Sequence, residues 1–200
     1  MRGLEDSGLN HGAAGNASLR TAEGFLITPT GVRPRDLTAD RQVALDPVGA
    51  SLGSAWRPSS EWRFHCDIYR MRPEIGAIVH VHSPYATALA TMRRDIPAFH
   101  YMISIAGGDS IRCAPYALFG SQALSDVALV ALVDRRACLL ANHGLIATGT
   151  SLQVAYDLTL AVEDLAHQYC LALQCGGPSL LSATEMTKVL EQFKTYGQQR

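Results

Sequence analysis

The 200-residue sequence lacks any long uninterrupted run of hydrophobic residues. A membrane-spanning helix needs about 20 consecutive apolar residues, and no stretch of this chain approaches that length. The first 20 residues also lack the apolar core of a signal peptide. We therefore expect a cytoplasmic protein with no membrane partner. Because 48% of the residues are hydrophobic, the chain can bury one sizeable core, and we expect a single domain over residues 1–200.

An excess of charge of one sign is missing as well. Lysine and arginine together number 17, aspartate and glutamate number 18, and the formal net charge is -1. The basic residues are scattered along the chain, whereas nucleic-acid-binding domains cluster them in a patch or stripe. A nucleic-acid partner is therefore not expected.

Cysteine is scarce and unsuitably spaced for two common structural roles. The five cysteines form an odd set without a C-x-x-C pair, which argues against a disulfide framework and against a thiolate zinc cage. A bound metal would have to be held by imidazole and carboxylate groups, and such ligand sets are typical of catalytic sites.

The hydrophobic pattern predicts a chain of alternating strands and helices. A glycine-rich turn runs into a strand that ends near residue 20, and further strands are expected at 25–28, 43–45, 78–82, 99–105 and 137–142. Helices are expected from 59–61 to about 72, from 84 to 92, from 151 to 173 and from 182 to 193. The first of these helices should have a serine as its N-cap and Glu61 in its first turn.

Two histidines end the predicted strand at 78–82. His80 and His82 are one residue apart and precede Ser83-Pro84, so both rings should leave the strand on the same face. His143 lies in an Asn-His-Gly turn at the end of another predicted strand. A lone buried histidine is most often a core residue, but three at strand ends with an open fourth position suit catalytic zinc. The remaining four histidines lack such a setting, and we expect them to be ordinary core or surface residues.

Glu61 is the fourth candidate for a metal site. A carboxylate is favoured near the start of any helix by the helix dipole, so its position has a purely structural explanation too. Ser59 and Ser60, however, add hydroxyl groups to the free N–H groups of the same helix start, and such a terminus readily binds an anion. A phosphate beside a metal is therefore expected, and four residues of two earlier turns could complete its pocket: Asn16, Ser18, Thr30 and Gly31.

Tyr101 lies in a hydrophobic segment and would ordinarily be a core or interface residue. Its phenol could still serve as a proton donor.

Eight short motifs, in order along the chain, resemble those of the class II aldolase family that includes fuculose-phosphate aldolase and the adducin head. The resemblance covers nearly the whole sequence. The motifs are GNAS at 15–18, TPTG at 28–31, PSSE at 58–61, HVH at 80–82, HYMI at 100–103, AGG at 106–108, NHGL at 142–145 and FKTYG at 193–197.

The resemblance implies a role for each motif residue. His80, His82 and His143 match three zinc-binding histidines, and Glu61 matches an acid that ligates the resting metal and shuttles a proton. Tyr101 resembles a tyrosine that reaches into the site of an adjacent subunit. Tyr196 resembles one on a mobile tail, here 194–200, that closes over substrate. Phosphate-binding positions are matched by Asn16, Thr30, Gly31, Ser59 and Ser60.

The resemblance also implies a fold and an assembly. The expected fold is a three-layer α/β/α sandwich around a largely antiparallel sheet, and the expected assembly is a homotetramer with active sites at subunit boundaries. Only residues 1–9 stand where a full first helix is expected, so that helix should be truncated.

The implied reaction is the cleavage of a phosphorylated sugar, a ketose 1-phosphate such as L-fuculose 1-phosphate, into dihydroxyacetone phosphate and an aldehyde. One Zn²⁺ per subunit, or another divalent metal, would stabilise the enediolate as a Lewis acid. Related enzymes that the pattern leaves open are an aldolase for 5-deoxyribulose or methylthioribulose 1-phosphate, a sugar-phosphate epimerase and a decarboxylase. A non-catalytic, adducin-like interaction module is a possibility from another class, and it should have lost its metal ligands. Epimerases that resemble this chain carry aspartate where Glu61 stands.

Overall fold

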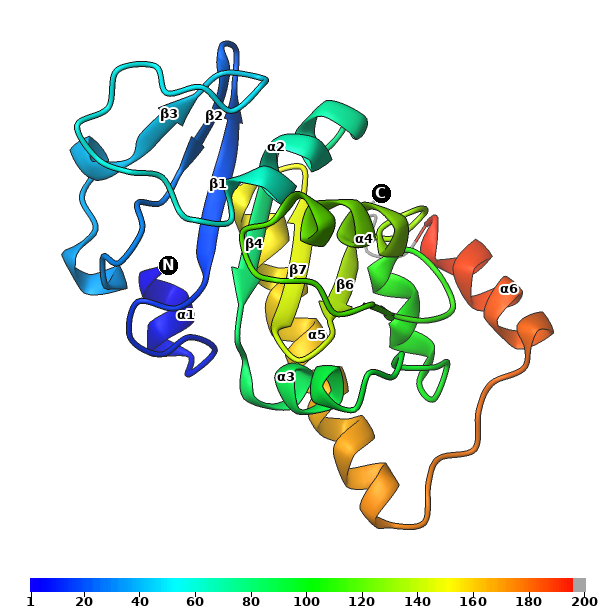
Figure 1. The fold of residues 1–200 in the computed structure, drawn as a ribbon. Coiled ribbons are helices and arrows are strands. Elements are labelled where there is room, and N and C mark those ends of the chain that lie inside the picture. Colours follow the sequence, from blue (N-terminus) through cyan, green and yellow to red (C-terminus); the bar gives the residue numbers. More distant parts are fainter. Residues whose placement is uncertain (196–200) are drawn as a thin grey trace.

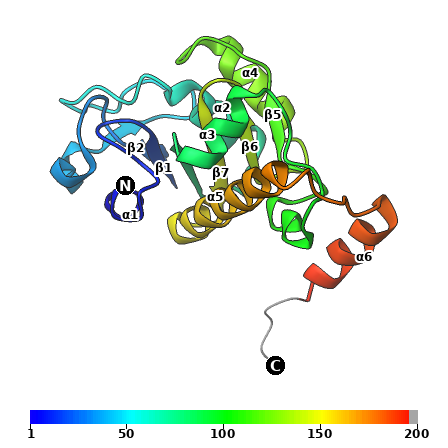
Figure 2. The same ribbon diagram turned by 90° about the horizontal axis from the view of Figure 1, so that it is seen from below.

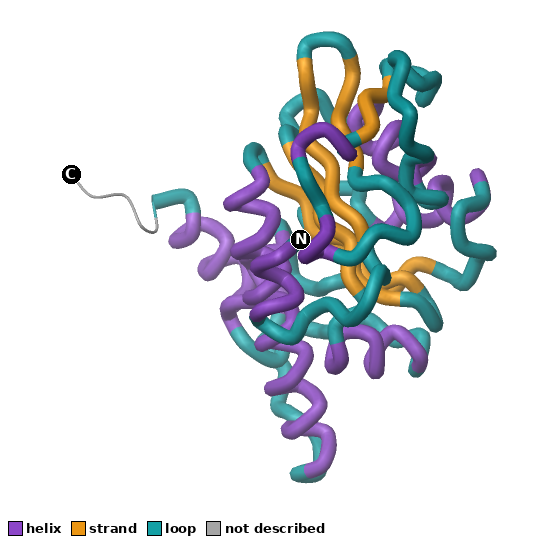
Figure 3. The backbone as a smooth tube through the Cα atoms, turned by 90° about the vertical axis from the view of Figure 1, so that its left-hand side faces the viewer, coloured by secondary structure: helices purple, strands orange, loops and turns teal. Residues whose placement is uncertain are grey.

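The computed structural model describes residues 1–195 and contains a seven-stranded sheet with helices on both of its faces (Figures 1 and 3). The strand order is β3-β2-β1-β4-β7-β6-β5, and all neighbouring strands are antiparallel except β5 and β6. The predicted, largely antiparallel sheet is therefore confirmed. The strands are β1 Asn16–Thr21, β2 Gly24–Ile27, β3 Val43–Leu45, β4 Ala77–Val81, β5 Arg112–Ala114, β6 Ala137–Leu140 and β7 Gly144–Gly149.

The helices divide between the two faces of the sheet. On one face, a hydrophobic cluster joins Val79 and Val81 of β4 to α3 and α5. On the other face, a second cluster joins Ile78 of the same strand to α2 and α4. Figure 2 shows α5 and α4 on opposite sides of the strands. This is the expected three-layer sandwich. The helices are α1 Arg2–Asp6, α2 Trp62–Met71, α3 Pro84–Thr91, α4 Gln122–Ala131, α5 Leu152–Gln174 and α6 Ala183–Phe193.

Two local predictions were wrong. Residues 99–105 do not form a strand, because Tyr101–Ala106 is a 3₁₀ helix. The Met102 N–H donates to the His100 side chain, and left-handed Gly107 ends the helix. Such a local hydrogen bond competes with strand formation. No serine is the N-cap of α2 either: Glu61 occupies that position and precedes the first turn.

Among residues 1–195, no helix combines the length and the apolar character that crossing a membrane would require.

Candidate metal centre

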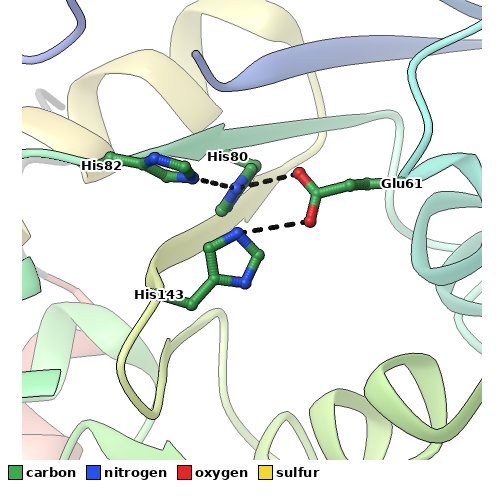
Figure 4. Close-up of side chains that lie close together, drawn as sticks. All are labelled: Glu61, His80, His82 and His143. Carbon is green, nitrogen blue, oxygen red and sulfur yellow. Dashed lines mark hydrogen bonds and ion pairs between the residues drawn. The ribbon is translucent and has the colours of Figure 1, made fainter. Parts of the chain in front are cut away.

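Four side chains from three separate segments converge at one end of the sheet (Figure 4). Each of Glu61, His80, His82 and His143 offers one ligand atom, and these atoms all lie within 4.8 Å of one another. His80 Nε2 is 3.1 Å from His82 Nε2 and 3.1 Å from Glu61 Oε2. His143 Nε2 is 3.3 Å from Glu61 Oε1. The structure thus brings together the four residues that the sequence proposed as a set.

The strand ends explain this convergence. His80 lies in β4 and His82 directly after it, while His143 lies in the turn between β6 and β7. That turn is tight because Asn142 adopts the left-handed conformation, with φ of 55°. Gly144 then passes so close to β4 that an added Cβ would lie 2.4 Å from the Val81 carbonyl oxygen. Glycine at this position therefore allows His143 to lie beside the end of β4.

The hydrogen bonds leave a metal-binding lone pair on His80. Its Nδ1 donates to the Leu145 carbonyl at 2.9 Å, so the neutral ring keeps Nε2 unprotonated and aimed at the cluster. Glu61 Oε1 is buried and has no hydrogen-bond partner within residues 1–195. His143 Nε2 lies within ion-pair distance of this oxygen but does not form a hydrogen bond with it. Converging imidazole lone pairs and an unpartnered carboxylate oxygen fit a divalent cation such as zinc.

Burial and mutual proximity shape the ionisation of the cluster. Burial, followed by the charge of His80, lowers the pKa of His82 and of His143 to about 4. Burial alone would raise the pKa of the Glu61 carboxyl. The adjacent imidazoles of His80 and His143 and a hydrogen bond from Asn16 outweigh that effect and lower its pKa. At neutral pH, His82 and His143 are therefore neutral and Glu61 is ionised, the forms that bind metal.

These pKa shifts predict that the metal-free protein loses stability in mild acid. His65, His82 and His143 have folded-state pKa values of about 3 to 4, whereas an unfolded histidine has a pKa of about 6.5. Between about pH 6.5 and 4 the unfolded chain binds more protons, so the free energy of unfolding falls as the pH falls. Melting temperatures of chelator-treated protein at pH 7.5, 6 and 5 should decrease in that order. An unchanged or higher melting temperature at pH 5 would contradict the burial of neutral histidines.

A cavity of about 330 Å³ adjoins the cluster. Glu61, His82 and His143 line it on one side. All five residues predicted to bind phosphate line the same cavity: Asn16, Thr30, Gly31, Ser59 and Ser60. Residues at its rim include the rings of Tyr116 and Phe119, which are 55% and 64% exposed. One cavity thus holds both parts of the site that the sequence suggested, while Ser18, the remaining turn candidate, lies outside this lining.

The loops around Thr30 and Ser59 are joined by backbone hydrogen bonds and form the polar side of this cavity. The Ser59 N–H donates to the Thr28 carbonyl, and the Thr30 N–H donates to the Arg57 carbonyl. Ser59 is buried, whereas Thr30 and Ser60 are exposed and free to meet a ligand.

Asn16 has a second function that the sequence did not suggest. Its Nδ2 donates to Glu61 Oε2 at 3.0 Å, and its Oδ1 lies 2.5 Å from His65 Nε2. Gly15 permits this placement, because an added Cβ would lie 2.5 Å from the His80 carbonyl oxygen. Asn16 therefore supports the metal candidate Glu61, and its second Nδ2 hydrogen leaves the predicted phosphate contact open.

Tyr101, one of the two predicted tyrosines, is not part of the observed cluster. Tyr101 is 48% exposed, stacks on His100, and does not line the cavity of its own chain. Its role at an adjacent subunit stays a prediction. Tyr196 lies outside the described residues.

Glu163 supports the segment after His82, and sequence reasoning missed it because it lies in the buried stripe of a long helix. Its carboxylate, on α5, accepts hydrogen bonds from the Ser83 hydroxyl at 2.6 Å, the Tyr85 N–H at 2.8 Å and the Ala86 N–H at 2.9 Å. These groups form the N-terminus of α3, whose N–H groups need acceptors. Glu163 thus fixes the chain immediately after His82.

Comparison with known proteins gives consistent matches over most of the chain. The family described as Class II Aldolase and Adducin N-terminal domain matches residues 1–170. A 5-methylthioribulose-1-phosphate/5-deoxyribulose-1-phosphate aldolase from Rhodospirillum rubrum is 53% identical over 190 residues, covering 95% of this chain and 86% of the relative. An L-fuculose phosphate aldolase from Escherichia coli K12 is 48% identical over 191 residues, covering 95% and 88%. A solved L-fuculose 1-phosphate aldolase structure matches with a TM-score of 0.93 at 38% identity, covering 96% of this chain and 92% of that one.

Proposed function

Because the chain belongs to the class II aldolase and adducin family, we propose that it is a metal-dependent aldolase acting on a ketose 1-phosphate. The products would be dihydroxyacetone phosphate and an aldehyde. The observation that carries this proposal is the single cavity in which Glu61, His82 and His143 face the hydroxyl-bearing loops of Thr30 and Ser60.

The ligand set supports a bound zinc ion held by Glu61, His80, His82 and His143. When bound there, a divalent cation supplies Lewis-acid stabilisation of the negative charge that develops beside a ketone during carbon–carbon cleavage. Imidazole sites accept several metals, so cobalt or manganese would also fit.

Glu61 is suited to move the proton of the reaction. Its lowered pKa keeps it ionised at neutral pH, and its carboxylate faces the cavity. In the condensation direction it would take a proton from the hydroxymethyl carbon of dihydroxyacetone phosphate, and in cleavage it would return that proton. A positioned base of this kind contributes about 10²- to 10⁴-fold to a rate.

The phosphate would lie away from the bond that breaks, against Thr30, Gly31, Ser59, Ser60 and Asn16. Binding energy from this remote group would orient the reacting carbon at Glu61.

The two candidate substrates differ in the aldehyde that each would release. The relatives named above act on L-fuculose phosphate or on 5-methylthioribulose and 5-deoxyribulose 1-phosphates. Both substrate types share the dihydroxyacetone phosphate half. L-Fuculose 1-phosphate remains our first candidate. The 53% identity to the Rhodospirillum rubrum enzyme supports 5-methylthioribulose or 5-deoxyribulose 1-phosphate as the second candidate. The rings of Tyr116 and Phe119, which line the cavity, would suit the methyl or methylthio end of such a substrate.

An adducin-like module and an epimerase both have less support than an aldolase. An adducin-like module should have lost metal ligands, yet all four are present and adjacent. An epimerase would be expected to carry aspartate at position 61, where this chain has glutamate.

We further propose that the chain works as a homotetramer, as the resemblance implies. The exposure of Tyr101 outside its own cavity supports a role for this ring at a neighbouring subunit.

An aldolase screen tests the proposed function. Dihydroxyacetone phosphate would be incubated with the protein and one of three aldehydes: L-lactaldehyde, acetaldehyde or methylthioacetaldehyde. We expect a ketose 1-phosphate product whose formation stops when a chelator is added and returns with zinc. Product identity then distinguishes the two candidate substrates. Absence of a product with every aldehyde, in protein shown to contain metal, would refute the aldolase proposal.

A further inference from the structure

A chain of buried polar side chains runs from Glu61 through Asn16 to side chains that do not line the cavity. His65 is completely buried, and Asn16, Ser18 and Tyr69 are each at most 5% exposed. Unpaired polar groups at this depth would be destabilising, so their hydrogen bonds matter. The proposed reaction makes no direct use of His65, Ser18 or Tyr69.

The direction of every hydrogen bond in this chain follows from Glu61. A carboxylate only accepts, so Asn16 must turn its NH₂ group toward Glu61 Oε2, and its Oδ1 must face His65. His65 Nε2 therefore donates to Asn16 at 2.5 Å. A neutral imidazole has one N–H, so His65 Nδ1 accepts from the Ser18 hydroxyl at 2.7 Å. The opposite orientation of the Asn16 amide would place two oxygens against each other.

The far end of the chain is anchored by Tyr69. Its hydroxyl donates to Ser18 Oγ at 2.7 Å. The Arg20 guanidinium lies 4.7 Å from the centre of the Tyr69 ring and donates to the backbone carbonyls of Tyr69, Arg72 and Ile75. The orientation of Ser18 is thus fixed from both sides.

Helix and strand periodicity produce this arrangement. His65 and Tyr69 are four residues apart on one face of α2, and Glu61, the N-cap of this helix, precedes His65 by the same spacing. Asn16 and Ser18 alternate along β1 and share the sheet face beneath it. The β1–β4 register also pairs Asn16 with His80, which places Asn16 beside the metal candidates.

We propose that His65 is a positioning residue that holds Glu61 in place by anchoring the Asn16 amide that donates to it. This inference rests on the proposed function and deepens it. Without a donor at position 65, the buried Asn16 Oδ1 loses its hydrogen-bond partner, and the amide can shift away from the position in which its Nδ2 donates to Glu61 Oε2. Glu61 would then leave the position from which it contacts the metal and takes its proton, while the phosphate-side hydroxyls would stay in place.

Three variants separate this role from a general effect on folding. In His65→Phe the ring volume is retained but the donor is lost. In His65→Gln an amide N–H can replace the donor. Asp67→Asn is the matched control, because Asp67 is a buried polar residue of the same helix that instead accepts hydrogen bonds from Gln122 and Ser125 near α4.

The readouts are zinc affinity, and the kcat and KM for deuterium exchange into dihydroxyacetone phosphate. Loss of an outer partner of a metal site typically costs about 10- to 100-fold. We expect His65→Phe to lose kcat and zinc affinity by such a factor and to raise KM through the displaced Asn16 amide, and His65→Gln to recover most of all three. Asp67→Asn should lower the melting temperature and leave kcat and zinc affinity unchanged. Folded His65→Phe with unaltered kcat and zinc affinity, or losses in all three variants that follow their melting temperatures, would overturn the proposal.

A spectroscopic measurement decides the geometry even if His65→Phe does not fold. In the wild-type protein with ¹⁵N-labelled histidine, His65 should be neutral and carry its proton on Nε2 at pH 7. A proton on Nδ1, or on both nitrogens, would contradict the hydrogen-bond chain. This measurement tests the hydrogen-bond chain without any need for catalysis. A wild-type protein without exchange activity would instead refute the proposed function, so the two failures can be told apart.

Discussion

Replacing His82 with alanine is expected to remove the metal and nearly all of the activity. The wild-type protein should bind about one divalent ion per chain, because its four ligand atoms lie within 4.8 Å of one another. His82 supplies one of the three imidazoles, and neither of the other two histidines can take over its ligand position. His80 is held by its hydrogen bond to the Leu145 carbonyl, and His143 lies in a tight turn. A Lewis acid contributes several kcal/mol to transition-state stabilisation, so the rate should fall by about a thousand-fold.

Metal content measured by elemental analysis after dialysis checks this expectation. The matched control is His167→Ala, because His167 stacks on Tyr85 and is not a member of the metal cluster. The control should keep its metal and its activity. Stoichiometric, tightly bound metal in folded His82→Ala would show that the ligand assignment is wrong.

The second large effect is expected for Glu61→Gln, which should separate binding from proton transfer. Glutamine keeps the shape of the side chain and can still face Asn16, but it cannot take a proton. The three histidines and the phosphate-side hydroxyls are unchanged, so a dihydroxyacetone phosphate analogue should still bind. Exchange of the carbon-bound proton with solvent should fall by about 10²- to 10⁴-fold, the usual contribution of a positioned base.

Analogue affinity and the exchange rate should be measured on the same zinc-loaded preparation. Asp67→Asn serves again as a control for removing a buried carboxylate from α2. Normal exchange in Glu61→Gln would remove Glu61 from the mechanism, whatever its contact with the metal.

The proximity of the three histidines could be predicted from the sequence because it follows from local rules. Alternation along the strand predicted to end at His82 was enough to expect two rings on one face. The glycine after His143 marked the turn that brings the third ring to the same end of the sheet. These signals lie within a few residues of each side chain.

The support of the site could not be predicted in the same way. His65 was expected to be an ordinary histidine, because nothing in the sequence shows that α2 lies over β1 with Asn16 opposite it. The strand predicted over 99–105 failed for a local reason. An apolar run does not distinguish a strand from a short helix, and the hydrogen bond between His100 and Met102 decided for the helix. A contact between distant segments thus determined the support of the site, whereas a local hydrogen bond determined the helix at Tyr101–Ala106.

In the proposed mechanism, Glu61 and the three histidines form a metal-dependent site for removing a proton beside a ketone. Nuclear magnetic resonance of dihydroxyacetone phosphate in D₂O tests it most directly, because no aldehyde is needed. With zinc-loaded protein, one hydrogen of the hydroxymethyl carbon should be replaced by deuterium. The exchange should stop when the metal is removed by a chelator and resume when zinc is restored. Exchange that continues at full rate in metal-free protein, or its absence in protein that holds one zinc per chain, would contradict the claim.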